Sequence, residues 1–405
     1  MNHPTHHIFA FTPKTLGDWC AERGMKPFRA KQVLEWVYRH GVIDPNGMTN
    51  LSQRDRDTLA SEMTFLSGET VAEQATSDGT RKVLVQWSDE ATKRRSDGGE
   101  RETAADDSTH NPSSLRRSVA SSLPVLGDTG GDPSRQTECV MIPSLDVRGD
   151  GQPSRRTACI SSQVGCPVGC RFCASGLGGL DGNLSTGRIV EQVWRLDRLV
   201  KDRDHPEARI SNIVFMGMGE PLANFRNVVN AVRTIAADWG MGIGARKITI
   251  STVGMHKAIE RLADELELPV TLALSLHAPN DALRRELIPW AEFTTIEQLF
   301  SACSRWFEKT GREITLEYTL LGGTNDRMEH AEELAEVAKK LRANVNLIRF
   351  NEVGGVPFRR PDTGDVRRFQ EILTSRGVNT HIRASRGRDI AAACGQLRHE
   401  KAGAG

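Results

Sequence analysis

Short apolar runs alternate with amphipathic stretches between residues 151 and 392, and this alternation restricts the possible folds more than any other feature of the chain. The runs are rich in β-branched residues and almost continuously apolar, which is typical of parallel strands covered on both faces. We therefore predict parallel β-α units arranged as a partial (β/α)6 barrel of the TIM type, with an open doubly wound sheet as the alternative. The predicted strands span residues 156–162, 210–217, 246–252, 269–277, 313–321, 344–350 and 379–385, and the predicted helices span residues 185–201, 224–239, 294–311 and 325–343.

The residues outside this region form smaller parts. Residues 1–13 have neither the basic start nor the apolar centre of a signal peptide, and we expect a disordered tail. Residues 14–68 predict a small helical accessory domain, because apolar residues from Phe28 to Val37 recur at helical spacing. Residues 393–405 are predicted as a C-terminal segment beyond the barrel.

Residues 69–150 predict a β-hairpin linker between the accessory domain and the barrel. The sequence Ser-Asp-Gly at 77–79 is a turn signal, and we expect the strand at 82–87 to pair with residues 137–143. Residues 91–136 are rich in Ser, Gly, Asp and Arg and hold almost no large apolar side chain. We therefore expect a disordered insertion inside the hairpin.

Composition and charge exclude several classes of protein. The formal net charge is +1 over 405 residues, so nucleic-acid binding would depend on a local basic patch. No apolar run is long enough to span a membrane. Because no export signal precedes them, the eight cysteines are not expected to form a disulfide framework, and we expect a cytoplasmic monomer.

Three of the cysteines, Cys166, Cys170 and Cys173, lie within "GCPVGCRFCASG" directly after the first predicted barrel strand. A structural zinc ion needs a fourth ligand, and no further Cys or His follows closely. Three thiolates leave one iron of a four-iron cluster open. The spacing Cys-x3-Cys-x2-Cys resembles the signature of radical S-adenosylmethionine (SAM) enzymes. This resemblance implies a 4Fe-4S cluster whose open iron binds SAM; buried structural cysteines are the alternative.

Further candidate residues follow the later strands, where barrels bind their ligands. The segment "MGMGEP" resembles the part of radical SAM enzymes that contacts the SAM amino group, with Gly219 allowing close approach and Glu220 supplying a counter-charge. A single polar residue after a strand is more often a cap, but a ring of them at successive strand ends predicts one SAM pocket. The other members of the ring are Ser251, Ser275, Leu276, His277 and Asn325.

Four segments together resemble the RlmN/Cfr family of radical SAM RNA adenine methyltransferases: "ACISSQVGCPVGCRFCASG", "FMGMGEPLAN", "ALSLHAPND" and "RASRGRDIAAACGQL". The resemblance extends from the N-terminal helices to the last thirty residues, apart from the insertion. The basic helical pair in residues 14–68 predicts an RNA-binding accessory domain, with a structural cap as the alternative. The resemblance implies methylation of the C2 carbon of an adenine in the peptidyl-transferase centre of 23S rRNA, and of the adenine 3′ of the tRNA anticodon. Methylation at C8 is the alternative within the family.

The resemblance implies a mechanism that uses two SAM molecules per turnover. The first methylates Cys394; the second is cleaved at the cluster to a 5′-deoxyadenosyl radical, which takes a hydrogen atom from the S-methyl group. The methylene radical adds to the base, a carboxylate removes the ring proton, and Cys159 releases the product by a transient disulfide with Cys394. Such a bond needs Cα atoms within about 7 Å, so the C-terminal segment must fold back over the barrel.

The same resemblance assigns the proton acceptor to Glu138, because Val140, Ile142 and Pro143 follow it as in the family motif. The segment from Glu138 to Cys159 is longer than the family pattern. Asp146 and Asp150, which lie in that segment, are therefore alternative proton acceptors.

Residues 359–398 carry nine arginines against four acidic residues, which predicts a phosphate-binding surface, with Arg383, Arg386 and Arg388 close to Cys394. The base must leave its stack to reach Cys394, so we expect a flipped nucleotide or a remodelled RNA. The implied partners are 23S rRNA, tRNA and an electron donor such as flavodoxin or ferredoxin. A non-enzymatic iron–sulfur RNA-binding protein and a radical SAM enzyme with another substrate class are the alternatives.

Overall fold

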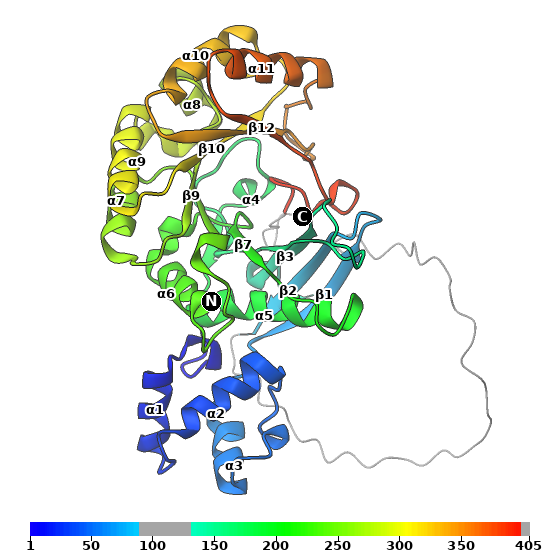
Figure 1. Ribbon diagram of the computed structural model, residues 1–405, viewed down its shortest axis with the longest axis vertical. Coiled ribbons are helices and arrows are strands. Elements are labelled where there is room, and N and C mark those ends of the chain that lie inside the picture. Colours follow the sequence, from blue (N-terminus) through cyan, green and yellow to red (C-terminus); the bar gives the residue numbers. More distant parts are fainter. Residues whose placement is uncertain (89–130, 398–405) are drawn as a thin grey trace, which may run out of the picture.

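The computed structural model describes residues 1–88 and 131–397 (Figure 1). Its central sheet contains consecutive parallel strands that follow the predicted runs closely, because each run is buried on the strand positions that face the core. All seven predicted strands of this region occur. They are β4 (Arg156–Cys159), β7 (Asn212–Phe215), β8 (Ile248–Thr252), β9 (Thr271–Ser275), β10 (Ile314–Leu320), β11 (Ala343–Arg349) and β12 (Thr380–Arg383). Strand β11 has the expected length with its bounds shifted by one residue, and the other six are shorter than expected.

Helices connect these strands and lie along the outer side of the curved sheet (Figure 1). Each parallel strand pairs with the next one in the chain, from β4 to β7 and on to β12. This arrangement confirms the partial parallel barrel. The helices are α5 (Thr186–Arg203), α6 (Phe225–Ala236), α7 (His256–Glu265), α8 (Asp281–Leu287), α9 (Ile296–Thr310), α10 (Met328–Ala338) and α11 (Thr363–Ser375).

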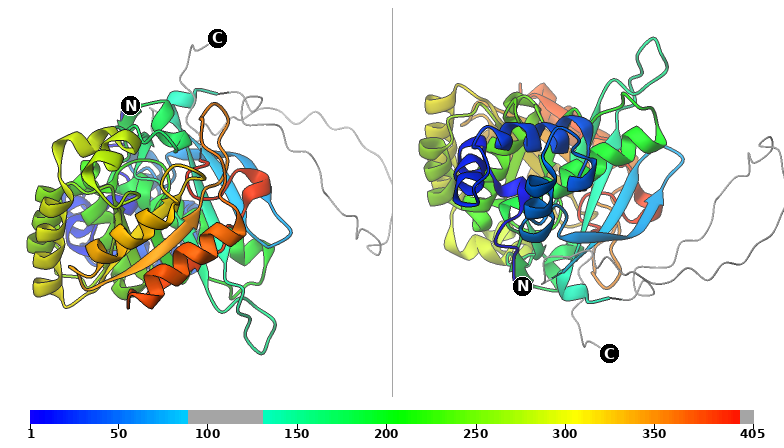
Figure 2. Two further views of the ribbon diagram at one scale, coloured as in Figure 1. Left: turned by 90° about the horizontal axis from the view of Figure 1, so that it is seen from above. Right: turned by 90° about the horizontal axis from the view of Figure 1, so that it is seen from below.

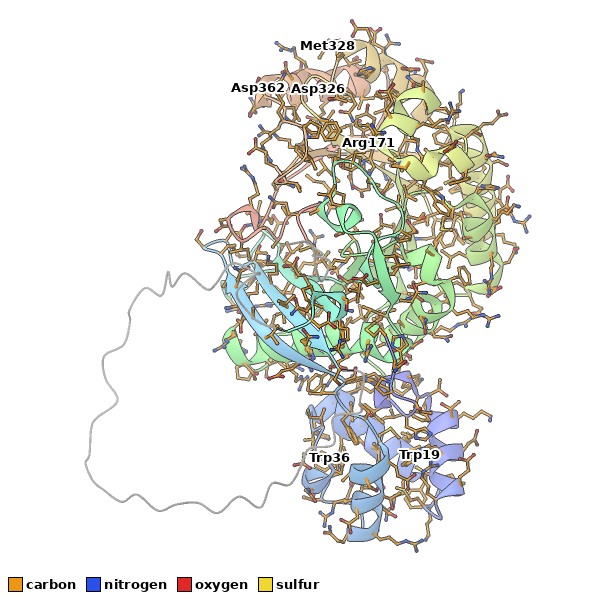
Figure 3. All side chains as sticks on the ribbon, turned by 180° about the vertical axis from the view of Figure 1, so that it is seen from behind. Trp19, Trp36, Arg171, Asp326, Met328 and Asp362 are labelled. Carbon is orange, nitrogen blue, oxygen red and sulfur yellow. The ribbon has the colours of Figure 1, made fainter. Side chains whose placement is uncertain are left out.

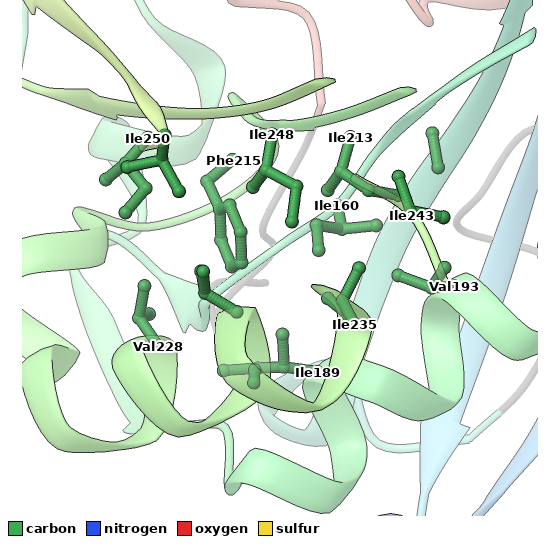
Figure 4. Close-up of a cluster of buried hydrophobic side chains, with 14 of the residues drawn as sticks. Ile160, Ile189, Val193, Ile213, Phe215, Val228, Ile235, Ile243, Ile248 and Ile250 are labelled. Carbon is green, nitrogen blue, oxygen red and sulfur yellow. The ribbon is translucent and has the colours of Figure 1, made fainter. Parts of the chain in front are cut away.

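The core between the sheet and its first helices is built almost entirely from β-branched side chains (Figure 4). Residues from β7 and β8 face residues from α5 and α6, and all of them are buried. Burial of each such side chain stabilises the fold by about 1.5–3 kcal/mol. The side chains are Ile213 and Phe215 of β7, Ile248 and Ile250 of β8, Ile189 and Val193 of α5, and Val228 and Ile235 of α6.

An antiparallel hairpin extends the sheet beyond β4. Strands β1 (Gly68–Ala75) and β2 (Arg81–Trp87) are joined by the expected turn, and β2 pairs with β3 (Gln136–Pro143) as predicted. The full sheet therefore has ten strands in the order β1-β2-β3-β4-β7-β8-β9-β10-β11-β12. Most of the predicted insertion 91–136 lies outside the described residues. Its last part is ordered, since Pro133–Arg135 forms a 3-10 turn that leads into β3.

Residues 14–68 contain α1 (Pro13–Glu22), α2 (Arg29–Glu35), a π-helical turn at Trp36–His40, and α3 (Gln53–Glu62). Figure 3 shows this helical domain, marked by Trp19 and Trp36, at the opposite end of the molecule from Asp326 and Asp362. It contacts the barrel through α5, where the Trp194 indole N–H donates to the Val37 carbonyl at 3.0 Å.

The expectation of a disordered tail at residues 1–13 is wrong. Ile8 and Phe9 are fully buried, and the Ile8 N–H donates to the Thr64 carbonyl at 2.9 Å. His7 lies 2.9 Å from the buried Glu191 of α5. The apolar pair Ile8 and Phe9 fills the space between the helical domain and α5, so the start of the chain is packed.

Among residues 1–88 and 131–397, no helix combines the length and the apolar character needed to cross a bilayer.

Candidate functional site

The cysteine loop lies between β5 (Gln163–Gly165) and β6 (Leu180–Asn183), which pair with each other as a small separate sheet. Its backbone is closed by hydrogen bonds from the Cys166 N–H to the Gly179 carbonyl, at 2.8 Å, and from the Cys173 N–H to the Cys170 carbonyl, at 3.2 Å. Gly169 has a φ of 71°, a conformation that favours glycine.

Cys166, Cys170 and Cys173 line one cavity at the C-terminal ends of the parallel strands. Burial raises the pKa of all three thiols, that of Cys166 to about 12, so the free thiols are protonated at neutral pH. Metal binding would displace these protons. Among the described residues, no three His, Cys, Asp or Glu side chains converge on a single metal ion. Three thiols that line one cavity fit a cluster, in which each thiolate binds a different iron.

The segment after β7 closes one side of this cavity. Gly219 has a φ of 101°, and a Cβ at this position would lie 2.7 Å from both the Gln163 Cβ and the Ser162 Oγ. The buried Glu220 carboxylate accepts hydrogen bonds from the Leu222 N–H at 2.9 Å and from the Val253 N–H at 2.8 Å. Burial raises the pKa of Glu220 above its usual range. Gly219 and Glu220 therefore present a fixed backbone and a fixed carboxyl group to the cavity.

The ends of β8, β9 and β10 supply further polar groups to the same cavity. The Oγ atoms of Ser251 and Ser275 are 3.3 Å apart across neighbouring strands. Glu317 of β10 is 3% exposed and also lines the cavity. Its Oε2 has no hydrogen-bond partner in the part of the chain that the structure describes, so it can accept a hydrogen bond from a ligand. A ligand with hydroxyl or amino groups fits this lining.

His277 lies in the cavity wall with its ring against Phe172 of the cysteine loop, at 5.0 Å between centroids. Burial lowers its pKa to about 3, so the ring is neutral, and its Nδ1 accepts the Thr319 N–H at 3.0 Å.

Leu276 and Asn325 lie behind this wall. The Leu276 side chain packs in the core, and the Asn325 amide donates to the carbonyls of His277 and Thr319, both at 2.8 Å. Neither residue is part of the cavity lining.

The C-terminal segment folds back over the barrel (Figure 1). Cys394, which lies in this segment, is exposed and lines two neighbouring cavities. The Ala174 N–H, next to Cys173, donates to the Gly395 carbonyl at 2.8 Å, and the Ser175 Oγ donates to the Leu397 carbonyl at 2.7 Å. Cys394 thus borders the cysteine cavity on one side and the second cavity on the other.

Cys159 lines the second cavity together with Cys394. Both residues are free thiols in this structure. Burial raises the pKa of the Cys159 thiol above its usual range. Val140, Met218, Ala392 and Leu397 pack around Cys159, so the segment that carries Cys394 is held against the strand that carries Cys159.

Glu138 lies on the same face of the sheet as Cys159. Val140 of β3 is directly opposite Cys159 of β4, and Glu138 is two residues before Val140, so all three side chains point to one side. The Glu138 carboxylate is 1% exposed and lies 2.9 Å from the Lys82 Nζ. Asp146 and Asp150 lie in an exposed loop, and Asp150 lines a different cavity. The geometry therefore favours Glu138 among the three carboxylates.

The arginines of the predicted phosphate-binding surface fall into two groups: some line the second cavity, and others form ion pairs elsewhere on the protein. Arg383 and Arg386 line that cavity, where Arg383 lies 3.7 Å from Glu317 and Arg386 lies 3.1 Å from Asp78. Arg376 instead forms surface ion pairs with Glu332 and Glu336. The charge count over residues 359–398 therefore overstates the number of arginines available to an RNA.

The sequence analysis missed two buried charged residues, Glu317 and Lys82. Each is a charged residue within a strand whose neighbours are mostly buried. Such a residue is almost never buried without a partner, and this signal could have marked both positions.

Comparison with known proteins gives two family matches. Residues 7–64 match the ribosomal RNA large subunit methyltransferase N-terminal domain, and residues 160–338 match the radical SAM superfamily.

Curated relatives match along almost the whole chain. A protein of Rhodopirellula baltica named as a probable dual-specificity RNA methyltransferase RlmN is 39% identical over 98% of this chain and 91% of its own length. The dual-specificity RNA methyltransferase RlmN of Dichelobacter nodosus is 37% identical over 96% of this chain and 93% of its own. The crystal structure of a radical SAM methyltransferase from Sphaerobacter thermophilus has a TM-score of 0.81 at 37% identity, and the match covers 98% of this chain and 100% of that one.

Proposed function

The chain belongs to the RlmN family of radical SAM RNA methyltransferases, and from this premise we propose that it methylates the C2 carbon of an adenine. The proposed substrates are an adenine in the peptidyl-transferase centre of 23S rRNA and the adenine 3′ of the anticodon in tRNAs. The curated relatives are named as dual-specificity enzymes, which supports two RNA substrates.

The observation that carries this proposal is the place of Cys394. The thiol borders both the cavity lined by the three clustered cysteines and the cavity lined by Cys159 and Arg383. A group carried on Cys394 can therefore be loaded from the first cavity and delivered to a substrate in the second. The adenine carbons C2 and C8 are poor nucleophiles, so a carrier that reacts through a radical suits them.

Cys166, Cys170 and Cys173 would hold the 4Fe-4S cluster, and Gly219, Glu220, Ser251, Ser275 and His277 would hold SAM. Leu276 and Asn325 do not line the cysteine cavity and would support its wall from behind. The Asn325 amide holds the wall by donating a hydrogen bond to the His277 carbonyl. When bound, the cluster and SAM supply the methyl group and the hydrogen-abstracting radical. Cys394 carries the methyl group, and the fold of its segment keeps it at the boundary of both cavities.

The remaining steps fall to two residues on one face of the sheet. Glu138 accepts the proton from the modified ring carbon. Cys159 then loses its proton and attacks the sulfur of Cys394. The S–S bond forms as the S–C bond breaks, the product carbon keeps the electron pair of that bond, and it takes up a proton to complete the methyl group. The shared cavity of Cys159 and Cys394 supports this transient disulfide.

RNA would reach the second cavity along Arg383 and Arg386, whose guanidinium groups lie beside it. The helical domain at residues 14–68 is proposed to grip the RNA, in line with its match to a ribosomal RNA methyltransferase domain. The proposed enzyme acts in the cytoplasm as a monomer and receives electrons from a flavodoxin or a ferredoxin.

The test is anaerobic reconstitution with iron and sulfide, followed by reaction with SAM, a reductant and fragments of 23S rRNA or tRNA. Mass spectrometry of the nucleosides should identify 2-methyladenosine, and a Cys394→Ala variant should form none. Product formation at the wild-type rate by Cys394→Ala would refute the mechanism. Detection of 8-methyladenosine instead would leave the proposed residue roles unchanged. It would show that the methylated carbon is C8 and not C2.

A further inference from the structure

Lys82 is a buried charged residue that none of the proposed steps uses. It lies on β2, is 3% exposed, and is directly opposite Val140 of β3. Residues directly opposite each other in an antiparallel pair share a face, so Lys82 lies on the same face as Glu138, Val140 and Cys159.

The Lys82 ammonium group contacts both the carboxylate and the C-terminal segment. Its Nζ lies 2.9 Å from the Glu138 Oε1, and it donates to the Ala391 carbonyl at 3.5 Å. Ala391 precedes Cys394 by three residues. One side chain therefore connects Glu138 to the segment that carries the reactive sulfur.

We propose that Lys82 is a positioning residue that keeps the Glu138 carboxylate ionised and fixed beneath the segment carrying Cys394. This inference rests on the proposed function, because it concerns the step in which Glu138 accepts the ring proton. In that step the C–H bond breaks, its electron pair stays in the ring, and the proton moves to a Glu138 oxygen.

The physical reason is the cost of a buried charge. A carboxylate removed from water reverts to its neutral form unless an opposite charge lies close to it. A neutral carboxyl group cannot accept the proton. The ammonium group at 2.9 Å supplies the opposite charge, and its hydrogen bond to Ala391 fixes where that charge lies.

The neighbouring contact between Arg386 and Asp78 provides a matched control. Asp78 lies in the β1–β2 turn and forms an ion pair with Arg386 at 3.1 Å that does not involve Glu138. This pair also connects the hairpin to the C-terminal segment, whose ribbon lies beside the hairpin in Figure 2. If Lys82 served only to dock the segment, loss of either contact would have the same effect.

The experiment uses full-length reconstituted protein with SAM, a reductant and an RNA fragment. It compares wild type, Lys82→Met, Lys82→Arg and Asp78→Asn. Three readouts are needed: S-methylation of Cys394 by peptide mass spectrometry, covalent protein–RNA adduct on denaturing gels, and methylated adenine.

We expect Lys82→Met to methylate Cys394 within about twofold of wild type, to accumulate the adduct, and to form product about 100-fold more slowly, as for loss of a general base. Lys82→Arg should keep turnover within about tenfold, because it retains the cation. Asp78→Asn should accumulate no adduct.

Lys82→Met removes a cation from beside a buried carboxylate and can destabilise the fold. The double variant Lys82→Met/Glu138→Gln removes both charges, and we expect it to fold and still accumulate adduct. If Lys82→Met does not fold, Lys82→Gln decides, because it keeps a hydrogen-bond donor and lacks the charge. It should accumulate the same adduct, and turnover within about tenfold of wild type would overturn the role of Lys82.

Normal turnover by Lys82→Met, or equal loss of Cys394 methylation in Lys82→Met and Asp78→Asn, would overturn the role of Lys82. Absence of methylated adenine with the wild type would instead refute the proposed function, so the two failures are distinguishable.

Discussion

The backbone N–H of Ala174 donates a 2.8 Å hydrogen bond to the carbonyl of Gly395. Ala174 follows the last cysteine of the clustered loop, and Gly395 follows the cysteine that borders both cavities. Two segments far apart in the sequence are therefore fixed to each other next to their reactive sulfurs. This contact joins the cysteine loop and the C-terminal segment into one site.

Replacement of Cys170 by Ala should abolish cluster binding, because the loop offers only three thiolates. Iron and acid-labile sulfide, measured after anaerobic reconstitution, should fall to background. Cys303→Ala is the matched control, since Cys303 is buried in α9 away from the cavity lining. Equal loss of iron in both variants would show that the effect comes from misfolding.

Replacement of Gly219 by Ala should weaken SAM binding at least about tenfold, since a φ of 101° is strained for alanine and its Cβ would meet Gln163 and Ser162 at 2.7 Å. Calorimetric titration of the reconstituted protein measures the effect. Gly364→Ala has open space around its Cβ and should bind SAM like the wild type. Unchanged affinity in Gly219→Ala would contradict a SAM contact at this segment.

Replacement of Asn325 by Ala should lower the free energy of unfolding by about 3 kcal/mol, because it leaves buried backbone groups without partners. The lost partners include the His277 carbonyl and the Leu321 N–H, the latter at 2.7 Å from the Asn325 Oδ1. Urea unfolding gives the stability change. SAM affinity should fall as well, and an affinity equal to wild type would show that the loop keeps its shape without this amide.

Glu191 should make the fold sensitive to acid. Its pKa is lowered from 4.5 to about 2, because hydrogen bonds and charge from His7 and Arg195 outweigh its burial. Since the folded value lies below the unfolded one, the stabilisation is fully present above about pH 4.5 and is lost as pH falls through about 2. Glu191→Gln should therefore lose about 3 kcal/mol at neutral pH and almost nothing near pH 2.

The difference in urea midpoint between Glu191→Gln and wild type, measured at about pH 6 and about pH 3, tests this expectation. The difference should shrink at the lower pH. Glu336→Gln removes an exposed ion pair with Lys339 and should stay close to wild type at both values. A difference that does not change with pH would show that Glu191 acts by packing alone.

Sequence reasoning predicted the parallel strands well because most of them bury apolar side chains in the core, and such a strand needs an apolar run that is visible in one chain. It also predicted the pairing of β2 with β3, because both segments are short runs rich in apolar and β-branched residues. The family resemblance is confirmed by relatives that match almost the whole chain. The roles of Cys394, Cys159 and Glu138 stay predictions, although the structure gathers these residues at one end of the barrel.

Other features depended on contacts that no single segment reveals. The packing of Ile8 and Phe9 requires a surface formed by α5 and the helical domain, so the apolar pair alone looked like part of a tail. The pairing of Lys82 with Glu138 depends on strand register, and that of Glu317 with Arg383 depends on the curvature of the sheet. The arginine count failed for the same reason, because it could not show which guanidinium groups already have partners.

The return of the C-terminal segment to the cysteine loop also has a consequence for biosynthesis. Translation completes the loop and every barrel strand before Cys394 leaves the ribosome. A chain interrupted after β12 would still offer three thiols to iron, yet it would lack Cys394, to which we assign the transfer of the methyl group. Under this assignment unfinished polypeptides cannot transfer a methyl group, and for part of synthesis the cysteine loop exists without the segment that later packs on it.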